Sequence, residues 1–328
     1  MYVTYFLLIN IKNNGEKLIK NINKNFFSKI GFNYLLLAIF AIIMQFIAGI
    51  ILVFIPGASE NSNIVMIITA ICNYILPIPI FLYLMNNLEK KRIRKHSLSI
   101  FNFIVAIAIA ITLMWIGNIF GLAITGLIGG VVQNEIANPV AEAIYNLDIW
   151  VNLLIMVIIA PIFEELFFRK LLIDRTIKYG GLVSVLLSAF MFALFHGNLN
   201  QFFYAFLIGG FFAFIYIKTG NILYSIALHM IVNFSGAILS VFIGNIMINI
   251  ANGVHISTLD TLFIVIYSLV YFTLIAVGII FLIKDRKKLK FKKSEKTLEN
   301  PVKTIVLNIG MVCFIGFNMI QIILSIIR

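Results

Sequence analysis

Long, nearly uninterrupted hydrophobic stretches alternate with short polar segments along this chain. Backbone polar groups in hydrocarbon must be satisfied internally, so each apolar stretch of roughly bilayer length predicts a transmembrane helix. The predicted spans are 33–55, 64–86, 100–130, 149–178, 182–196, 202–217, 222–247, 260–283 and 304–327. The spans at 182–196 and 202–217 are short, and two tilted helices or one re-entrant hairpin fit them equally well. The sequence therefore predicts an all-α polytopic transmembrane bundle of about 8 to 9 spans.

Composition and charge agree with a membrane protein. Hydrophobic residues make up 62% of the chain and charged residues only 12%, about half the usual charged share of a soluble domain. With the N-terminus placed in the cytoplasm, 24 of the 25 Lys and Arg residues fall in inner segments, as the positive-inside rule requires. The net charge of +12 is thus spread between spans rather than over one soluble face, which argues against a nucleic-acid partner.

The same pattern suggests a division of the chain. Residues 1–30 are predicted to be an interfacial amphipathic segment, and 31–284 to be the membrane core. A basic cytoplasmic loop at 285–303 is expected to precede an additional C-terminal span at 304–328.

Ionisable and amide side chains interrupt the apolar background at a few places within the spans. Such residues are costly in a bilayer and usually face a cavity, so they mark a candidate functional site. They all lie between residues 145 and 245, and they are Glu164, Glu165, Arg169, His196, His229 and Asn233.

The spacing of these residues from predicted inner turns brings them to similar depths. Glu164 lies 16 residues before Gly180 and His196 lies 16 residues after it, roughly 24 Å from the turn in a helical hairpin. Measured from Gly220, His229 and Asn233 lie roughly 14 and 20 Å along the next helix. We therefore expect three helices to present one polar cluster.

The residue types in this cluster suit hydrolysis. Glu165 and Arg169 stand at i and i+4 and can pair, whereas Glu164 points about 100° away and stays free to take a proton from water. His229 and Asn233, also at i and i+4, offer N–H donors to a developing oxyanion.

Two nearby features concern the backbone. Pro161 is expected to kink the fourth span one turn before Glu164 and to leave a carbonyl without a partner. Gly209 and Gly210 are expected to allow close approach of a neighbouring helix rather than to bind phosphate.

Three motifs, each on its own predicted helix, resemble the CPBP family (CAAX-processing and bacteriocin-processing, Abi-like) of intramembrane proteases. They are Glu164-Glu165-x-x-x-Arg169, Phe192-x-x-x-His196 and His229-x-x-x-Asn233. The resemblance implies an endopeptidase whose helices surround an inward-opening cavity. It implies that Glu164 is the activating base with His196, that Glu165 and Arg169 support it, and that His229 and Asn233 form the oxyanion site.

The same residues are compatible with two alternative functions. One is a zinc-dependent intramembrane metalloprotease with Glu164, His196 and His229 as metal ligands, although an amide such as Asn233 is a poor zinc ligand and no H-E-x-x-H pair is present. The other is a non-catalytic membrane immunity protein or a transporter.

The leading hypothesis also predicts the cofactor requirement, the partners and the location of the protein. We expect the protein to require no cofactor, to act on a peptide or a membrane-associated protein, and to have the lipid bilayer as its other partner. The abundance of Ile, Asn and Lys favours a bacterial plasma membrane, where bacteriocin-like peptides are more plausible substrates than prenylated proteins.

Overall fold

Helices alone form the regular structure of the described part of the protein. The computed structural model describes residues 2–133, 136, 138–286, 291, 294 and 298–327, together with the side chains of these residues other than 2–20 and 139–141. The elements in order are α1 (Tyr2–Val53), α2 (Ser62–Ala70), η1 (Ile71–Ile75), α3 (Ile78–Asn86), α4 (Ile100–Val132), α5 (Pro139–Asn146), α6 (Ile149–Asn152), η2 (Leu153–Ile159), α7 (Ala160–Glu165), η3 (Leu166–Leu171), α8 (Leu172–Thr176), η4 (Ile177–Tyr179), α9 (Gly181–Phe195), α10 (Leu199–Thr219), α11 (Ile222–Phe234), η5 (Ser235–Leu239), α12 (Ser240–Ala251), α13 (Thr258–Lys284), α14 (Pro301–Ile305) and α15 (Ile309–Ile327).

Eight helical stretches are long and apolar enough to cross a membrane within the residues described. They are Asn21–Val53, Ser62–Asn86, Ile100–Val132, Ile149–Tyr179, Leu199–Thr219, Ile222–Ala251, Thr258–Lys284 and Ile309–Ile327. The short apolar helix α9 accounts for the remaining predicted stretch. The prediction of an all-α polytopic transmembrane bundle is confirmed.

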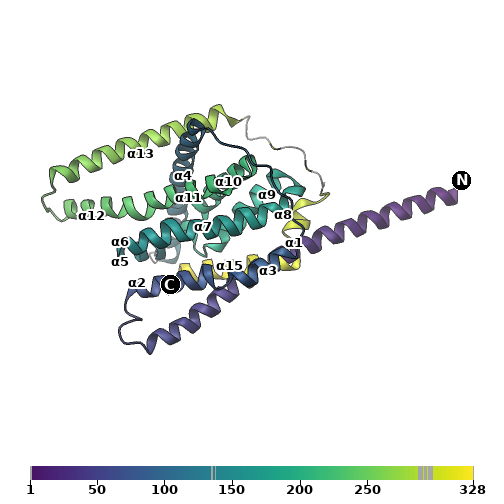
Figure 1. The fold of residues 1–328 in the computed structure, drawn as a ribbon, viewed down its shortest axis with the longest axis horizontal. Coiled ribbons are helices and arrows are strands. Elements are labelled where there is room, and N and C mark those ends of the chain that lie inside the picture. Colours follow the sequence, from purple (N-terminus) through teal and green to yellow (C-terminus); the bar gives the residue numbers. More distant parts are fainter. Residues whose placement is uncertain are drawn as a thin grey trace.

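The bundle has two ends, which we name by their connecting segments. The inner end carries the 87–99 linker, the turn at Gly180 and the end of α10 at Thr219, and it lies on the right of Figure 1. The outer end carries the 54–61 loop, α5 and the 252–257 turn, on the left of Figure 1.

The first helix is longer than the predicted first span. It runs unbroken from Tyr2 to Val53, and its N-terminal part projects beyond the inner end (Figure 1). From Asn21 onward, where its side chains are described, Phe27 and Ile30 are fully buried. The predicted interfacial segment 1–30 is thus continuous with the first span. About half of the predicted basic loop at 285–303, namely residues 287–290, 292, 293 and 295–297, lies outside the described residues.

The C-terminal helix packs directly on this first helix. A Cβ added to Gly310 of α15 would overlap the Ser28 carbonyl of α1. The two helix backbones are therefore in direct contact, which only glycine permits at this position. The Ser28 hydroxyl also accepts a hydrogen bond from the Gly310 N–H at 3.0 Å. The extra span is therefore an integral part of the bundle.

We expect Gly310→Val to lower the free energy of unfolding by about 1–3 kcal/mol, because the added side chain forces α15 away from α1. Thermal unfolding of the purified protein in detergent measures this loss. The matched control is Gly316→Val on the same helix, since nothing lies within 4 Å of a Cβ at Gly316. Equal stability of the two variants would contradict the described contact.

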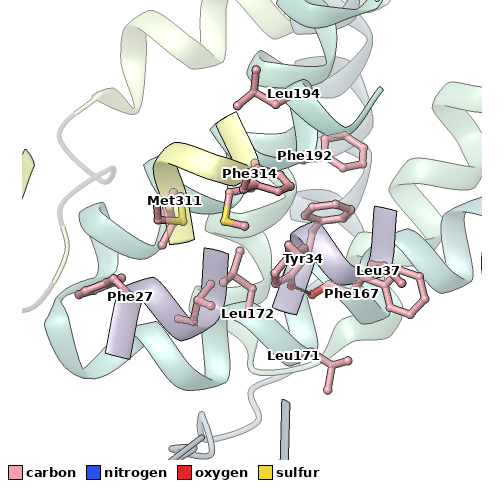
Figure 2. Close-up of a cluster of buried hydrophobic side chains, with 14 of the residues drawn as sticks. Phe27, Tyr34, Leu37, Phe167, Leu171, Leu172, Phe192, Leu194, Met311 and Phe314 are labelled. Atoms are coloured by element: carbon pink, nitrogen blue, oxygen red, sulfur yellow. Dashed lines mark hydrogen bonds between the residues drawn. The ribbon is translucent and has the colours of Figure 1, made fainter. Parts of the chain in front are cut away.

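The inner end is closed by a large apolar cluster. Figure 2 shows Phe27 and Tyr34 of α1 gathered with Leu172 of α8 and with Met311 and Phe314 of α15. The polar run from Arg169 to Lys178 lies inside this end, and the fourth span stays helical to Tyr179. Arg175 is only 1% exposed, and its buried guanidinium is satisfied by donating to the carbonyls of Met85 and Leu171 at 2.7 and 2.8 Å.

The α9–α10 hairpin stops before the outer end of its neighbour α4. The first turn of α10 lies at the level of Gly121, where a Cβ would overlap the carbonyl oxygen of Asn200. Beyond this level α4 continues to Val132, roughly 16 Å farther along its own axis. The short hairpin leaves space between the outer halves of the surrounding helices.

Candidate active site

A cavity of about 760 Å³ lies beyond the tip of this hairpin. Its walls come from helices far apart in sequence, including α1, η1, α4, α7, α11 and α15. Four of the six predicted site residues line it: Glu164, His196, His229 and Asn233. Glu165 and Arg169 are fully buried behind the wall. We call this cavity the chamber.

Glu164 is the acidic side chain that faces the chamber. Its carboxylate accepts a hydrogen bond from the Tyr74 hydroxyl at 2.8 Å, and its other oxygen lies 3.6 Å from Nε2 of His229. The side chain is 17% exposed, so water in the chamber can reach it while most of it stays packed. The carboxylate is therefore held in place but open to water.

Glu165 links the buried arginine to a chamber histidine. Its Oε2 lies 3.2 Å from Nε of Arg169, which is an ion-pair distance without good hydrogen-bond geometry. Its Oε1 accepts a hydrogen bond from Nδ1–H of His229 at 3.0 Å. A carboxylate in this position fixes the orientation of the imidazole, as the carboxylate of a catalytic triad does.

The Arg169 guanidinium lies over the face of Phe192, 4.3 Å from the ring centroid. Gly209 of α10 leaves the room for this stack, since a Cβ there would press on the Phe192 ring. The predicted close helix approach at Gly209 is thus confirmed, because the same Cβ would also touch the backbone of Ala189 on α9.

His196 is the residue immediately after the last turn of α9. Its Nδ1 lies 2.8 Å from the carbonyl oxygen of Phe192, and because a carbonyl only accepts, Nδ1 carries the proton. In the neutral ring Nε2 then has a free lone pair. His196 can therefore accept a hydrogen bond from water in the chamber.

Asn233 bonds to the backbone that Pro161 disturbs. The fourth span is π-helical over Leu153–Ile159, where Ala160 N–H donates to the Ile155 carbonyl. In this register the Met156 carbonyl would bond to residue 161, but proline has no N–H. The Asn233 amide donates to that carbonyl at 2.8 Å, which leaves its second N–H for the chamber.

All four π-helical turns of the described chain contribute to the chamber wall. Such turns insert an extra residue into a helix, rotate the following side chains and frequently occur at functional sites. The lining residues they supply are Asn73 and Tyr74 from η1, Met156 from η2, Phe167 and Phe168 from η3, and Gly236 and Ala237 from η5.

Several lining residues were not among the predicted site residues. Tyr74 is the most direct, because it touches Glu164 and stacks on Phe163 with ring centroids 5.7 Å apart. Asn318 and Gln321 of α15 also line the chamber, so the C-terminal helix does more than pack. The sequence offered one signal for Tyr74, Asn318 and Gln321, which is that they are polar side chains in otherwise apolar spans.

We expect Tyr74→Phe to lower peptide hydrolysis about 10- to 100-fold, because a hydrogen bond to a charged group contributes about 1.5–3 kcal/mol. The loss should appear in kcat, measured with any peptide that the wild-type protein cleaves. Tyr83→Phe is the matched control, since Tyr83 is 70% exposed. Unchanged turnover in Tyr74→Phe would remove Tyr74 from the site.

The zinc alternative can be compared with the side chains of the described residues. No group of three or more His, Cys, Asp or Glu side chains among them is arranged to hold a metal ion. Of the three ligands that the metalloprotease alternative requires, Glu164 and His229 approach each other, and both histidines use Nδ1 for a hydrogen bond, which leaves Nε2 available.

Comparison with known proteins agrees with the resemblance noted in the sequence. Residues 146–235 match the family model described as type II CAAX prenyl endopeptidase Rce1-like. This family is part of the CPBP group, so this segment of the chain is similar to the CPBP intramembrane proteases. A search of curated proteins and a search of solved structures each returned no match.

Proposed function

We propose that this multi-pass membrane protein is an intramembrane endopeptidase in which Glu164 activates water for attack on a peptide bond. The observation that carries the proposal is the contact set of Glu164. Tyr74 holds one carboxylate oxygen at 2.8 Å, His229 lies 3.6 Å from the other, and the group faces the chamber. The family-model match over residues 146–235 supports the coarser assignment as a protease.

The first chemical step is attack by water. Glu164 takes a proton from a water molecule, and Nε2 of His196 accepts the second hydrogen of that water as a hydrogen bond. The water oxygen forms a bond to the peptide carbonyl carbon, and the carbonyl π electrons move to oxygen. Holding water and carbonyl together in one chamber supplies the proximity that the reaction needs.

The oxyanion then requires N–H donors. The free N–H of Asn233 is one, and Nε2–H of a doubly protonated His229 is the other. Glu165 accepts from Nδ1–H of that imidazolium at 3.0 Å. When the C–N bond breaks, Glu164 returns its proton to the amine nitrogen, so that the products are a carboxylic acid and an amine.

The substrate class follows from the surroundings. We expect a peptide or a membrane-associated protein within a bacterial plasma membrane, with bacteriocin-like peptides as one instance. The chamber volume of about 760 Å³ falls in the usual range for ligand sites and exceeds what a few waters need. No cofactor is required by this chemistry.

The function is tested by finding new peptide ends. Membranes from cells producing the wild-type protein or Glu164→Gln are compared by mass spectrometry of peptide N-termini. We expect internal cleavage products that appear only with the wild-type protein. If both membranes yield the same termini while the wild-type protein still confers a protective or transport phenotype, the non-catalytic alternative replaces the proposal.

A chelator separates the glutamate mechanism from the zinc alternative. Treatment of the purified protein with a strong chelator followed by dialysis should leave the hydrolysis rate unchanged, because no step passes through a metal. Metal content is measured on the same sample. Loss of activity on chelation with recovery on adding Zn²⁺ would instead support the metalloprotease.

A further inference from the structure

A chain of side-chain hydrogen bonds runs along the first turn of α10, beside the chamber. Oδ1 of Asn198 accepts from the backbone N–H of Gln201 at 2.9 Å and so caps the helix. Because Oδ1 is the accepting atom of this carboxamide, Nδ2 is its donor, and it donates to Oε1 of Gln201 at 2.5 Å. Both side chains are buried, so the cap also fixes the orientation of the Gln201 carboxamide.

The direction of these hydrogen bonds determines what the hydroxyl group of Tyr204 can do. Nε2 of Gln201 donates to the Tyr204 oxygen at 2.6 Å, so the hydroxyl accepts this bond and its own hydrogen must point elsewhere. Among the described residues, no acceptor for that hydrogen lies within hydrogen-bond distance. Gln201 and Tyr204 both line the chamber, so the Tyr204 O–H is a donor available to a molecule bound there.

Two glycines of α4 hold Tyr204 in this position. A Cβ added to Gly117 would overlap Cα of Tyr204, and a Cβ added to Gly121 would overlap the carbonyl oxygen of Asn200. The start of α10 therefore lies directly on the backbone of α4, as small residues four positions apart permit. The Tyr204 ring is also partly buried against apolar neighbours. A donor that is already fixed in place loses little conformational entropy when a ligand binds.

Helix geometry separates this donor from the reacting groups. Phe212 packs on the His229 ring with centroids 5.2 Å apart. Tyr204 comes eight residues before Phe212 on α10, which is roughly 12 Å along the helix axis. The chamber follows α10 over this stretch, since Gln201, Tyr204 and Ile208 all line it. An extended peptide advances about 3.3 Å per residue, so this distance corresponds to about three to four residues of substrate.

We propose that Tyr204 is a substrate-binding residue, whose hydroxyl donates a hydrogen bond to a backbone carbonyl of the peptide about three to four residues from the scissile bond. Gln201 and Asn198 are positioning residues, because they act through the direction of that hydroxyl. The proposal rests on the proposed function for the existence of a peptide substrate. It implies that an extended stretch of main chain is recognised beside the cleaved bond, without regard to the side chain at that position.

Tyr204→Phe tests this role, because it keeps the ring and removes only the hydroxyl. We expect KM to rise about 2- to 10-fold with kcat unchanged, as the loss of one neutral hydrogen bond to bound substrate predicts. The assay uses the peptide found by comparing N-termini. Tyr83→Phe on the exposed face of α3 is the matched control and should change neither constant. An unchanged KM, or a fall in kcat, would overturn the proposal.

A set of modified peptides locates the contact. In each peptide, one backbone carbonyl is replaced by a methylene group. The peptide altered about three to four residues from the scissile bond should bind the wild-type protein less tightly than the parent peptide, but should bind Tyr204→Phe as tightly as the parent peptide does. Equal losses for both proteins at every altered position would overturn the proposal.

Gln201→Met tests the positioning role, because methionine has a similar length but cannot donate to Tyr204. We expect a smaller rise in KM than in Tyr204→Phe, and no further rise when the two changes are combined. Additive rises would mean that Gln201 contacts the substrate itself and would overturn its positioning role. If Glu164→Gln abolishes cleavage while Tyr204→Phe matches the wild-type protein, only this inference fails. If Glu164→Gln cleaves normally, the proposed function fails instead.

Discussion

Glu164→Gln should reduce peptide hydrolysis about 10²- to 10⁴-fold, the contribution typical of a positioned general base. Glutamine has nearly the same shape and can still accept the hydrogen bond from Tyr74, but its amide cannot take a proton from water. The expected loss is therefore in kcat, measured with a cleaved peptide and the purified protein in lipid. Thermal unfolding of the variant should match that of the wild-type protein.

The matched control for this substitution is Glu142→Gln. Glu142 is an exposed residue of α5, and we expect the change to leave kcat unaltered. Full activity of Glu164→Gln on a verified substrate would contradict the assignment of Glu164 as the base. A large fall in its unfolding temperature would assign the effect to folding instead.

Arg169→Met should lower the free energy of unfolding by about 3–5 kcal/mol, because it removes one partner of a fully buried ion pair. Glu165 keeps its hydrogen bond from His229 but loses the cation 3.2 Å from its other oxygen. Chemical unfolding in detergent micelles measures the change. Arg92→Met in the exposed 87–99 linker is the matched control, with no expected change.

The double variant Glu165→Gln with Arg169→Met separates charge from packing. If the loss in Arg169→Met comes from an unpaired buried carboxylate, neutralising Glu165 should restore part of the stability, and the two changes should be non-additive. Simple addition of the two losses would mean that the stack of Arg169 on Phe192, at 4.3 Å, is the main contribution.

The sequence predicts the spans and the depth of the polar cluster because both follow from fixed helix geometry. Each residue of a helix advances about 1.5 Å, so distances counted from Gly180 and Gly220 place Glu164, His196 and His229 at similar levels. The chamber contains all three. Short turns made this possible, since they relate neighbouring helices directly.

Counting residues from a turn does not predict contacts between helices that no short turn connects. Tyr74 reaches Glu164 from the second span, 90 positions away, and no spacing rule relates the two. The rotation that aims Tyr74 comes from a π-helical turn, which apolar periodicity does not reveal. The same holds for the contribution of α15, which depends on its glycine contact with α1.

The position of the chamber also required the structure. Hydropathy predicts that 182–196 is short, but the chamber depends on where the hairpin ends beside α4 and on how α5 and η5 line the space beyond it. The start of the first helix also differs from the prediction, because its burial depends on contacts with distant helices. Polar residues before Asn33 look solvent-exposed in the sequence, yet Asn23 and Ser28 are buried by contacts with Tyr179 and α15.

The central claim, direct attack by a water that Glu164 activates, is tested most directly by one turnover of the wild-type protein in H₂¹⁸O. We predict one ¹⁸O atom in the new C-terminal carboxyl group of the product, with no label in the enzyme. A first product that carries only ¹⁶O, together with ¹⁸O in the Glu164 side chain, would contradict the claim, because Glu164 would then have attacked the substrate itself.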